Sequence, residues 1–172
     1  LYKKVIGGLL IQLRQKSFDN LEKLEEGTIS DELLDKMITF AKNDLLLQLP
    51  DDFDGLAKDA KLNLLQKLMN RPIRICGMVK NEGEPGGGPF WVENSKGEVS
   101  LQIVESSQID LNAPGQKEIV QNATHFNPVD LVCSVQDYKG RPYDLTEFVD
   151  PETGFISTKS KDGKNLKAQE LP

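Results

Sequence analysis

The chain has 172 residues, which is enough for one core of useful size or for two small ones. Its formal net charge of −6 and its pI near 4.9 argue against a general attraction to nucleic acid or to an anionic membrane, because phosphate groups need a basic face. No apolar run approaches the ~20 residues that a membrane-spanning helix needs. We therefore predict a cytoplasmic protein with no nucleic-acid partner and no membrane partner.

The two cysteines, Cys76 and Cys133, each lie in an apolar, strand-like run. No CxxC motif and no Cys/His cluster accompanies them, so the sequence offers no ligand set for zinc and predicts no metal site. We expect two buried free thiols, as in a reducing compartment, with a disulfide as the alternative.

The first half of the chain, residues 1–71, reads as a helical segment. A first helix is expected around Val5–Leu13, although Gly7 and Gly8 lie inside it and either weaken it or allow a close backbone approach. In "ISDELLDKMITFAKNDLLLQLP", Ser30 is a natural N-cap and apolar residues follow at spacings of three and four. The stretch "GLAKDAKLNLLQKLMN" repeats this spacing, and both stripes predict core-facing helices.

The second half, residues 72–172, reads as strands and turns of a mixed β-sheet. The segments "IRICGMV" and "EVSLQIVE" alternate apolar and polar residues, and "DLVCSV" is continuously apolar, as a buried strand should be. A short helix is expected at "GQKEIVQNA", and Asp162-Gly163 predicts a hairpin turn. The chain thus predicts an α/β fold with a helical N-terminal segment packed on a mixed sheet.

The stretch "EPGGGPFWVEN" combines three glycines, Gly86, Gly87 and Gly88, with the aromatic pair Phe90-Trp91. It matches neither a Walker A loop nor GxGxxG. Glycines let backbone N–H groups approach a phosphate or a sugar closely, and the two aromatic side chains suit stacking on a base or a sugar ring. The alternative is a strand-connecting loop with Phe90 and Trp91 as its hydrophobic anchor.

Two further polar positions are candidates for binding a ligand. Glu105 ends the apolar run "LQIVE", where a carboxylate above a sheet can accept hydrogen bonds from ligand hydroxyls; the alternative is a strand simply leaving into solvent. Asn127, in "THFNPVDLV", is either aimed at a ligand or satisfies a turn before Pro128. The sole histidine, His125, is expected to be structural, because no nucleophile pattern accompanies it.

The segment "DYKGRPYDL" groups Lys139 and Arg141 with two tyrosines. It is either a local phosphate-binding spot in an acidic protein or a solvated turn.

The run from "ICGMVKNEGEPGGGPFWVENSKGEVSLQIVESSQID" to "ATHFNPVDLVCSVQDYKGRPYDLTEFVDPETGFISTKSKDG" resembles an uncharacterised bacterial family, number 4301 among the domains of unknown function. Members of that family are longer than this chain. The resemblance therefore implies a fragment whose partner is the remainder of its own longer polypeptide.

A second, more distant resemblance is to UDP-sugar pyrophosphorylases and other GT-A-like nucleotidyltransferases. Their "VGVV", "VVEYSE" and "FNAGN" motifs are similar in order to "CGMV", "IVESSQ" and "HFNPV" here. The resemblance implies that Glu105 hydrogen-bonds sugar hydroxyls and that Asn127 takes the position of the first asparagine. Gln108 replaces the second glutamate, Val129-Asp130 replace a Gly-Asn pair, and the upstream Gly-rich loop with its "PKG" lysine is absent from this chain.

The resulting hypothesis is a portion of a sugar-1-phosphate nucleotidyltransferase-like protein that binds a small-molecule nucleotide or sugar phosphate. Glycines 86–88, Phe90, Trp91, Glu105 and Asn127 would line the sugar side. The resemblance implies Mg²⁺ in the full-length protein, with none held by this chain alone, and no turnover by the chain alone. The alternative is a non-catalytic ligand-binding or structural module on the same fold.

Overall fold

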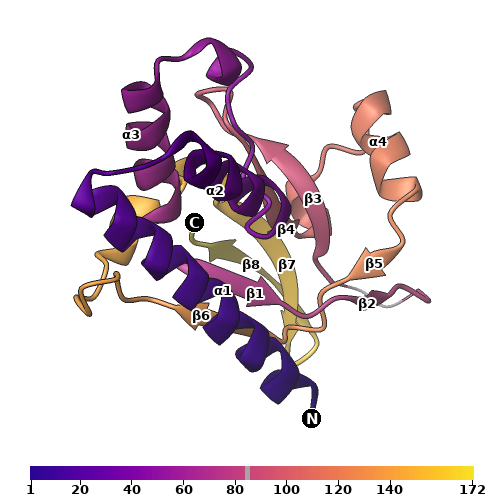
Figure 1. The fold of residues 1–172 in the computed structure, drawn as a ribbon. Coiled ribbons are helices and arrows are strands. Elements are labelled where there is room, and N and C mark those ends of the chain that lie inside the picture. Colours follow the sequence, from indigo (N-terminus) through magenta and orange to yellow (C-terminus); the bar gives the residue numbers. More distant parts are fainter. Residues whose placement is uncertain (84–85) are drawn as a thin grey trace.

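The structure is a computed structural model that describes residues 1–83 and 86–172. Three helices form one layer: α1 (Tyr2–Glu26), α2 (Asp31–Asn43) and α3 (Lys58–Met69). Helix α1 packs against both α3 and the strand pair β1 (Ile73–Cys76) and β6 (Leu131–Ser134), and α2 packs against α3 (Figure 1). The α/β class predicted from the sequence is therefore confirmed.

The largest buried cluster lies inside this helical layer. Its fully buried side chains include Leu21, Met37, Leu65 and Met69, one or more from each helix. Ile75 and Tyr138 pack against it from the strand half and join the two halves of the chain. None of the helices in the described ranges has the length and apolar content to cross a bilayer.

The predicted helix signals hold at α2 but underestimate α1. Ser30 caps α2, because its hydroxyl accepts the N–H of Leu33 at 3.2 Å, and Asp31 and Glu32 occupy the first turn near the positive end of the helix dipole. Helix α1 runs well beyond Leu13, to Glu26. Gly27 follows it with a φ of 80°, a left-handed conformation that glycine adopts without steric cost. The second half of α1 contains many charged residues, so its apolar face, which includes the buried Leu21, is hard to recognise in the sequence.

The glycine pair Gly7-Gly8 makes no close backbone contact. A Cβ built on either residue meets nothing within 4 Å, so these positions face open space. The close backbone approach is therefore not observed, and the alternative, that the pair weakens the helix, is the one that fits the structure.

Where a mixed sheet was predicted, the strands form small antiparallel pairs. In addition to β1–β6, these are β2 (Val79–Lys80) with β5 (His125–Phe126), β3 (Gly88–Glu93) with β4 (Val99–Val104), and β7 (Phe155–Lys161) with β8 (Lys164–Glu170). Parallel pairing needs a long crossover, whereas these neighbours are joined by tight turns or by the returning chain. The remaining helix, α4 (Pro114–Gln121), is the short helix expected there.

The ladders β1–β6 and β2–β5 belong to one pair of chain segments that is interrupted by a bulge. Cys76 pairs with Leu131, and the next paired residues are Val79 and Phe126. Two residues on one side therefore lie opposite four on the other, Asn127–Asp130. Pro128 has no N–H to give to a ladder, which favours a bulge at this point.

The two thiols lie on the β1–β6 pair and are both free. Cys76 is only half-buried, where a buried thiol was predicted. Cys133 is exposed, because β6 presents one face to solvent. The prediction of two buried thiols and of a buried strand is wrong at this position.

The segment "DYKGRPYDL" ties the strand half to the helices. Asp137 accepts hydrogen bonds from the backbone N–H groups of Lys139 and Arg141 and from the Arg141 guanidinium, and the amine of Lys139 pairs with Glu25 of α1. The Tyr143 hydroxyl donates to Asn70 Oδ1 at 2.9 Å. Both cations of this segment are therefore paired with carboxylates of the fold.

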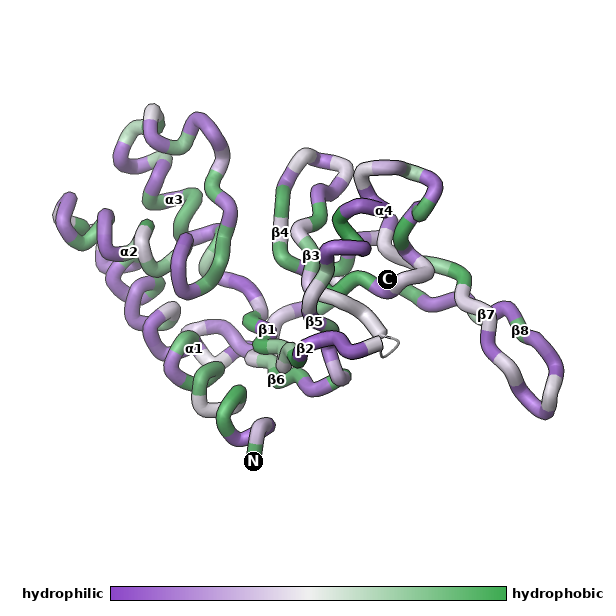
Figure 2. Tube along the Cα trace, turned by 90° about the vertical axis from the view of Figure 1, so that its right-hand side faces the viewer, coloured by the Kyte–Doolittle hydropathy of each residue, from purple (hydrophilic) through white to green (hydrophobic). Residues whose placement is uncertain are grey.

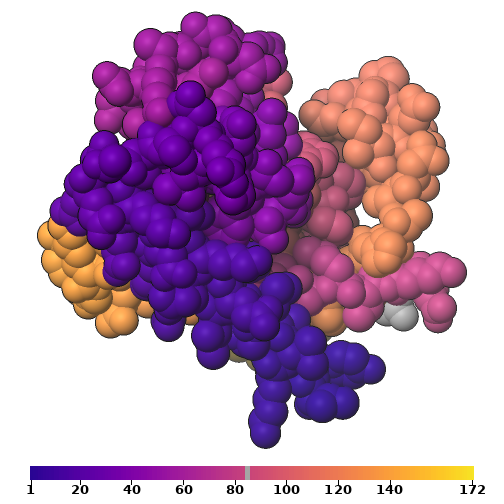
Figure 3. Space-filling model, in the orientation of Figure 1, coloured from indigo at the N-terminus to yellow at the C-terminus, as the bar shows by residue number. Residues whose placement is uncertain are grey.

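The β7–β8 hairpin stands away from the rest of the molecule (Figure 2). Asp162 and Gly163 form its turn with φ angles of 53° and 76°, as predicted for this pair of residues. In the space-filling view, α4 likewise forms a separate lobe beside the helical layer, and the start of α1 protrudes (Figure 3).

We predict that Gly7→Ala and Gly8→Ala each stabilise the protein by about 0.5–1 kcal/mol, because alanine restricts the unfolded chain and meets no obstacle in the helix. Urea unfolding followed by circular dichroism measures the change. Gly27→Ala is the matched control, and it should destabilise the protein because of the positive φ at that position. Equal destabilisation by all three changes would contradict the open environment of the pair.

We also predict an acid-sensitive contribution from Asp137. Burial alone would raise the pKa of its carboxyl, but the N–H groups and guanidinium of Arg141 and the Lys139 N–H outweigh burial and lower it. A lowered pKa means that the stabilisation is complete above the ordinary aspartate value of about 3.9 and is lost as pH falls through the folded-state value.

Asp137→Asn should therefore lower the melting temperature at pH 7 and flatten its fall as the pH drops below about 4. Melting temperature against pH, with Asp162→Asn at the exposed hairpin turn as the control, measures both effects. An unchanged pH profile in Asp137→Asn would rule out this assignment.

Candidate functional site

A cavity of about 620 Å³ lies where three of the strand pairs meet. This volume falls in the range of small-molecule sites. Its walls come from β1, β4 and the β5–β6 bulge, and from the glycine loop that precedes β3. The lining residues are Arg74, Gly86, Gly87, Ile103, Glu105, Phe126, Asn127, Pro128, Val129 and Leu131.

The glycine loop forms one wall because it lies directly against β4 and β5. A Cβ added at Gly87 would lie 2.6 Å from Ile103 Cγ2 and 2.9 Å from Glu105 Oε1, so both side chains would have to move. A Cβ at Gly86 would lie 3.2 Å from the Phe126 ring. The glycines are therefore required by the close approach of the loop to the cavity wall.

Glu105 directly follows β4 and has its carboxylate beside Gly87, at the edge of the cavity. Its backbone N–H donates to Gln108 Oε1 at 2.8 Å, and the Gln108 amide donates in turn to the carbonyl of Thr153 at 2.9 Å. Glu105 and Gln108 thus form a capping box, which holds the Glu105 carboxylate at the edge of the cavity.

Arg74 supplies positive charge and was not among the residues predicted from the sequence. It lies on β1 opposite Cys133, and its Nη2 donates to Gln102 Oε1 of β4 at 2.9 Å. This hydrogen bond holds the guanidinium across the junction between two strand pairs. A planar guanidinium held in this way is suited to a phosphate or a carboxylate. The alternation of "IRICGMV" places Arg74 opposite its apolar neighbours, but only the pairing shows what it faces.

Asn127 lines the cavity, but the fold uses its amide. The residue is 6% exposed; Nδ2 donates to the Gly77 carbonyl at 2.6 Å, and Oδ1 accepts the N–H of Val129 at 2.9 Å. Its own backbone N–H donates to the Gly87 carbonyl at 2.8 Å. Asn127 therefore holds the bulge and the glycine loop together, which makes it a positioning residue for the cavity.

The aromatic pair is divided between two faces of the β3–β4 hairpin. Pro89 pairs with Ile103 and Trp91 with Leu101, so Trp91 shares the face of the cavity-lining Ile103. Phe90 points to the other face, where its ring fills the space beside Gly88. Among the described residues Gly88, Phe90 and Trp91 are outside the lining, and Trp91 is 51% exposed beside it.

The described residues do not make a site for Mg²⁺ on their own. Glu105 is the one carboxylate among those that line the cavity, and the described ranges hold no group of three metal-ligating side chains. Mg²⁺ is usually held by one or two carboxylates together with substrate phosphates and water molecules, in near-octahedral geometry. His125 lies outside the lining, exposed on β5, with its Nδ1 2.8 Å from the Thr124 hydroxyl.

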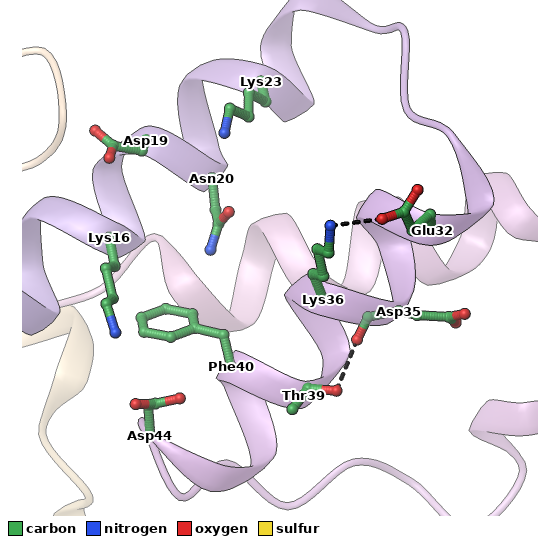
Figure 4. A pocket seen from close by; sticks show the side chains of 10 residues that line it. All are labelled: Lys16, Asp19, Asn20, Lys23, Glu32, Asp35, Lys36, Thr39, Phe40 and Asp44. Carbon is green, nitrogen blue, oxygen red and sulfur yellow. Dashed lines mark hydrogen bonds and ion pairs between the residues drawn. The ribbon is translucent and has the colours of Figure 1, made fainter.

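A second hollow of about 520 Å³ lies between α1 and α2 (Figure 4). Lys16, Lys23 and Lys36 come to it from the two helices, but four carboxylates lie among them, and Lys36 is paired with Glu32 at 2.6 Å. Phe40 closes its floor. The mixed charges and exposed side chains are those of a solvated groove between packed helices.

The chain is thus an α/β protein with a cavity of ligand size at a junction of antiparallel strand pairs. It belongs to the family described as Domain of unknown function (DUF4301), whose model matches residues 1–172. Neither a curated protein nor a solved structure matches the chain. The family resemblance inferred from the sequence is therefore confirmed.

We predict that Gly87→Ala destabilises the protein by about 1–3 kcal/mol, because the methyl group collides with Ile103 and Glu105. Chemical denaturation measures the loss. The double variant Gly87→Ala/Ile103→Ala should lose less than the sum of its two single variants, since it removes the nearest obstacle. Gly115→Ala, which meets nothing within 4 Å, is the control. Strict additivity of the two changes would contradict the close approach.

Proposed function

We propose that this chain binds a sugar phosphate or nucleotide sugar in the 620 Å³ cavity, as part of a cytoplasmic sugar-1-phosphate nucleotidyltransferase-like protein. The observation that carries the proposal is the convergence of Arg74 and Glu105 on one cavity from β1 and β4. A guanidinium is suited to the phosphate, and a carboxylate is suited to sugar hydroxyls. A phosphate is repelled by Glu105, so the two charges orient the ligand.

The glycine loop adds main-chain groups to this arrangement. Gly86 and Gly87 bring backbone to the cavity without side chains, so a ligand can approach it closely. Ile103, Phe126 and Leu131 provide apolar walls beside these polar groups. Trp91, on the same face of the β3–β4 hairpin as Ile103, extends this surface toward a longer ligand such as a nucleotide sugar.

The alternative, a non-catalytic binding module, is favoured by one observation. Arg74 is the single cation among the described residues that line the cavity, whereas phosphoryl transfer needs several positive groups around the reacting phosphate. We therefore propose binding without turnover by this chain alone. An enzyme on this fold would need Mg²⁺ and further cations from the rest of a longer polypeptide, whereas a binding module would not.

Isothermal titration calorimetry with UDP-glucose, UTP and glucose 1-phosphate tests the binding. Arg74→Gln should weaken binding of all three phosphate-bearing probes by about tenfold or more, the loss of one charge-assisted hydrogen bond. Glu105→Gln should weaken UDP-glucose and glucose 1-phosphate more than UTP, because the glucose hydroxyls meet the carboxylate. Lys96→Gln and Glu93→Gln, at the far end of the same hairpin, are the matched controls.

Binding of none of the three probes to the wild-type chain would refute the proposal. Release of pyrophosphate from UTP and glucose 1-phosphate, followed with the same protein, separates the two alternatives. We expect binding without release. Turnover by the isolated chain would exclude the non-catalytic reading.

A further inference from the structure

Val129 has a backbone conformation that β-branched residues avoid. Its φ is 66°, in the left-handed region, where the branched side chain crowds the backbone. The residue lies in the bulge Asn127–Asp130, opposite Gly77 and Met78. A glycine would adopt this conformation without strain.

The hydrogen bonds of the bulge hold Val129 in this conformation. Its N–H donates to Asn127 Oδ1, and the Gly77 N–H donates to the carbonyl of Asp130 at 2.7 Å on the other side. The Asp130 carboxylate in turn pairs with Lys3 of α1 at 3.0 Å. The residues on both sides of Val129 are therefore tied to other segments, so the strain cannot relax.

Packing within the fold does not offset this strain. The side chain of Val129 is 83% exposed, although it is among the residues that line the cavity. An apolar group that is strained and exposed at the rim of a cavity is of no use to folding. It is of use to a ligand that covers it.

We infer that the isopropyl group of Val129 packs against the C–H face of a sugar ring bound in the cavity. This inference rests on the proposed function and deepens it. A pyranose ring presents hydroxyls at its edge and C–H groups on its faces. Glu105 is suited to the edge and Val129 to a face, so together they select a ring that carries both.

The arrangement makes a specific demand on the ligand. In the proposed binding mode Arg74 takes the phosphate, and Val129 contacts only the sugar. Loss of the isopropyl group should therefore affect only ligands that carry the sugar. UDP-glucose and UDP are the probe pair that isolates this difference.

The test compares Val129→Gly with the wild-type chain. We expect the melting temperature of the free variant to rise by about 2 °C, because the strain is relieved. We expect its affinity for UDP-glucose to fall about fivefold to tenfold, and its affinity for UDP to remain unchanged. Leu46→Gly, at another positive φ of 55° away from the cavity, is the control and should leave both affinities unchanged.

Each contrary result has its own meaning. A variant Val129→Gly that binds UDP-glucose as tightly as the wild type overturns the inference, while losses in Arg74→Gln and Glu105→Gln keep the proposed function. A melting temperature that falls as far in Val129→Gly as in Val99→Gly, a matched change in strand β4, refutes the strain on which the inference depends. Binding of neither probe to the wild-type chain overturns both the inference and the proposed function.

Discussion

The hydrogen bonds of Asn127 are the interaction on which the candidate site depends. One residue joins three segments: the Gly77 turn after β1, the glycine loop at Gly87, and the bulge at Val129. Because Asn127 is almost fully buried, leaving its partners unsatisfied costs much more than a surface hydrogen bond. The shape of the cavity is therefore set by a side chain that itself has little left to offer a ligand.

This arrangement separates the residues that shape the cavity from the residues that can bind in it. Glycines and an asparagine bring the walls together, while Arg74 and Glu105 carry the charge. Such a division is common in binding sites, where the first contacts need support from neighbours that hold them in place. It also means that a single exchange at Asn127 would disturb several contacts at once.

The sequence predicts α2 and the β7–β8 turn well because their signals are local. Ser30 and the apolar spacing after it are enough to place α2, and Asp162-Gly163 is enough to place a turn. Strand β3 is missed because glycine and proline dominate its start, and the single mixed sheet is wrong because strand pairing is decided by residues far apart in the chain.

In the candidate site, too, the residues with a local signal are predicted and those that depend on distant pairing are missed. Glu105 is visible in the sequence because it ends an apolar run, and the glycine loop because of its composition. Arg74 is hidden, since an arginine in an alternating strand looks like any exposed position until its neighbour Gln102 is known. The separate faces of Phe90 and Trp91 likewise need the register of β3 with β4, which no local signal provides.

Helix α1 lies across the β1–β6 strand pair and is held by an ion pair near each of its ends. Lys3 pairs with Asp130 near its start, and Glu25 pairs with Lys139 near its end, 114 residues further along the chain. During synthesis α1 is therefore made long before Asp130 and Lys139, the residues with which it pairs. The apolar face of α1 therefore stays uncovered until the segment that carries Asp130 and Lys139 has also been made.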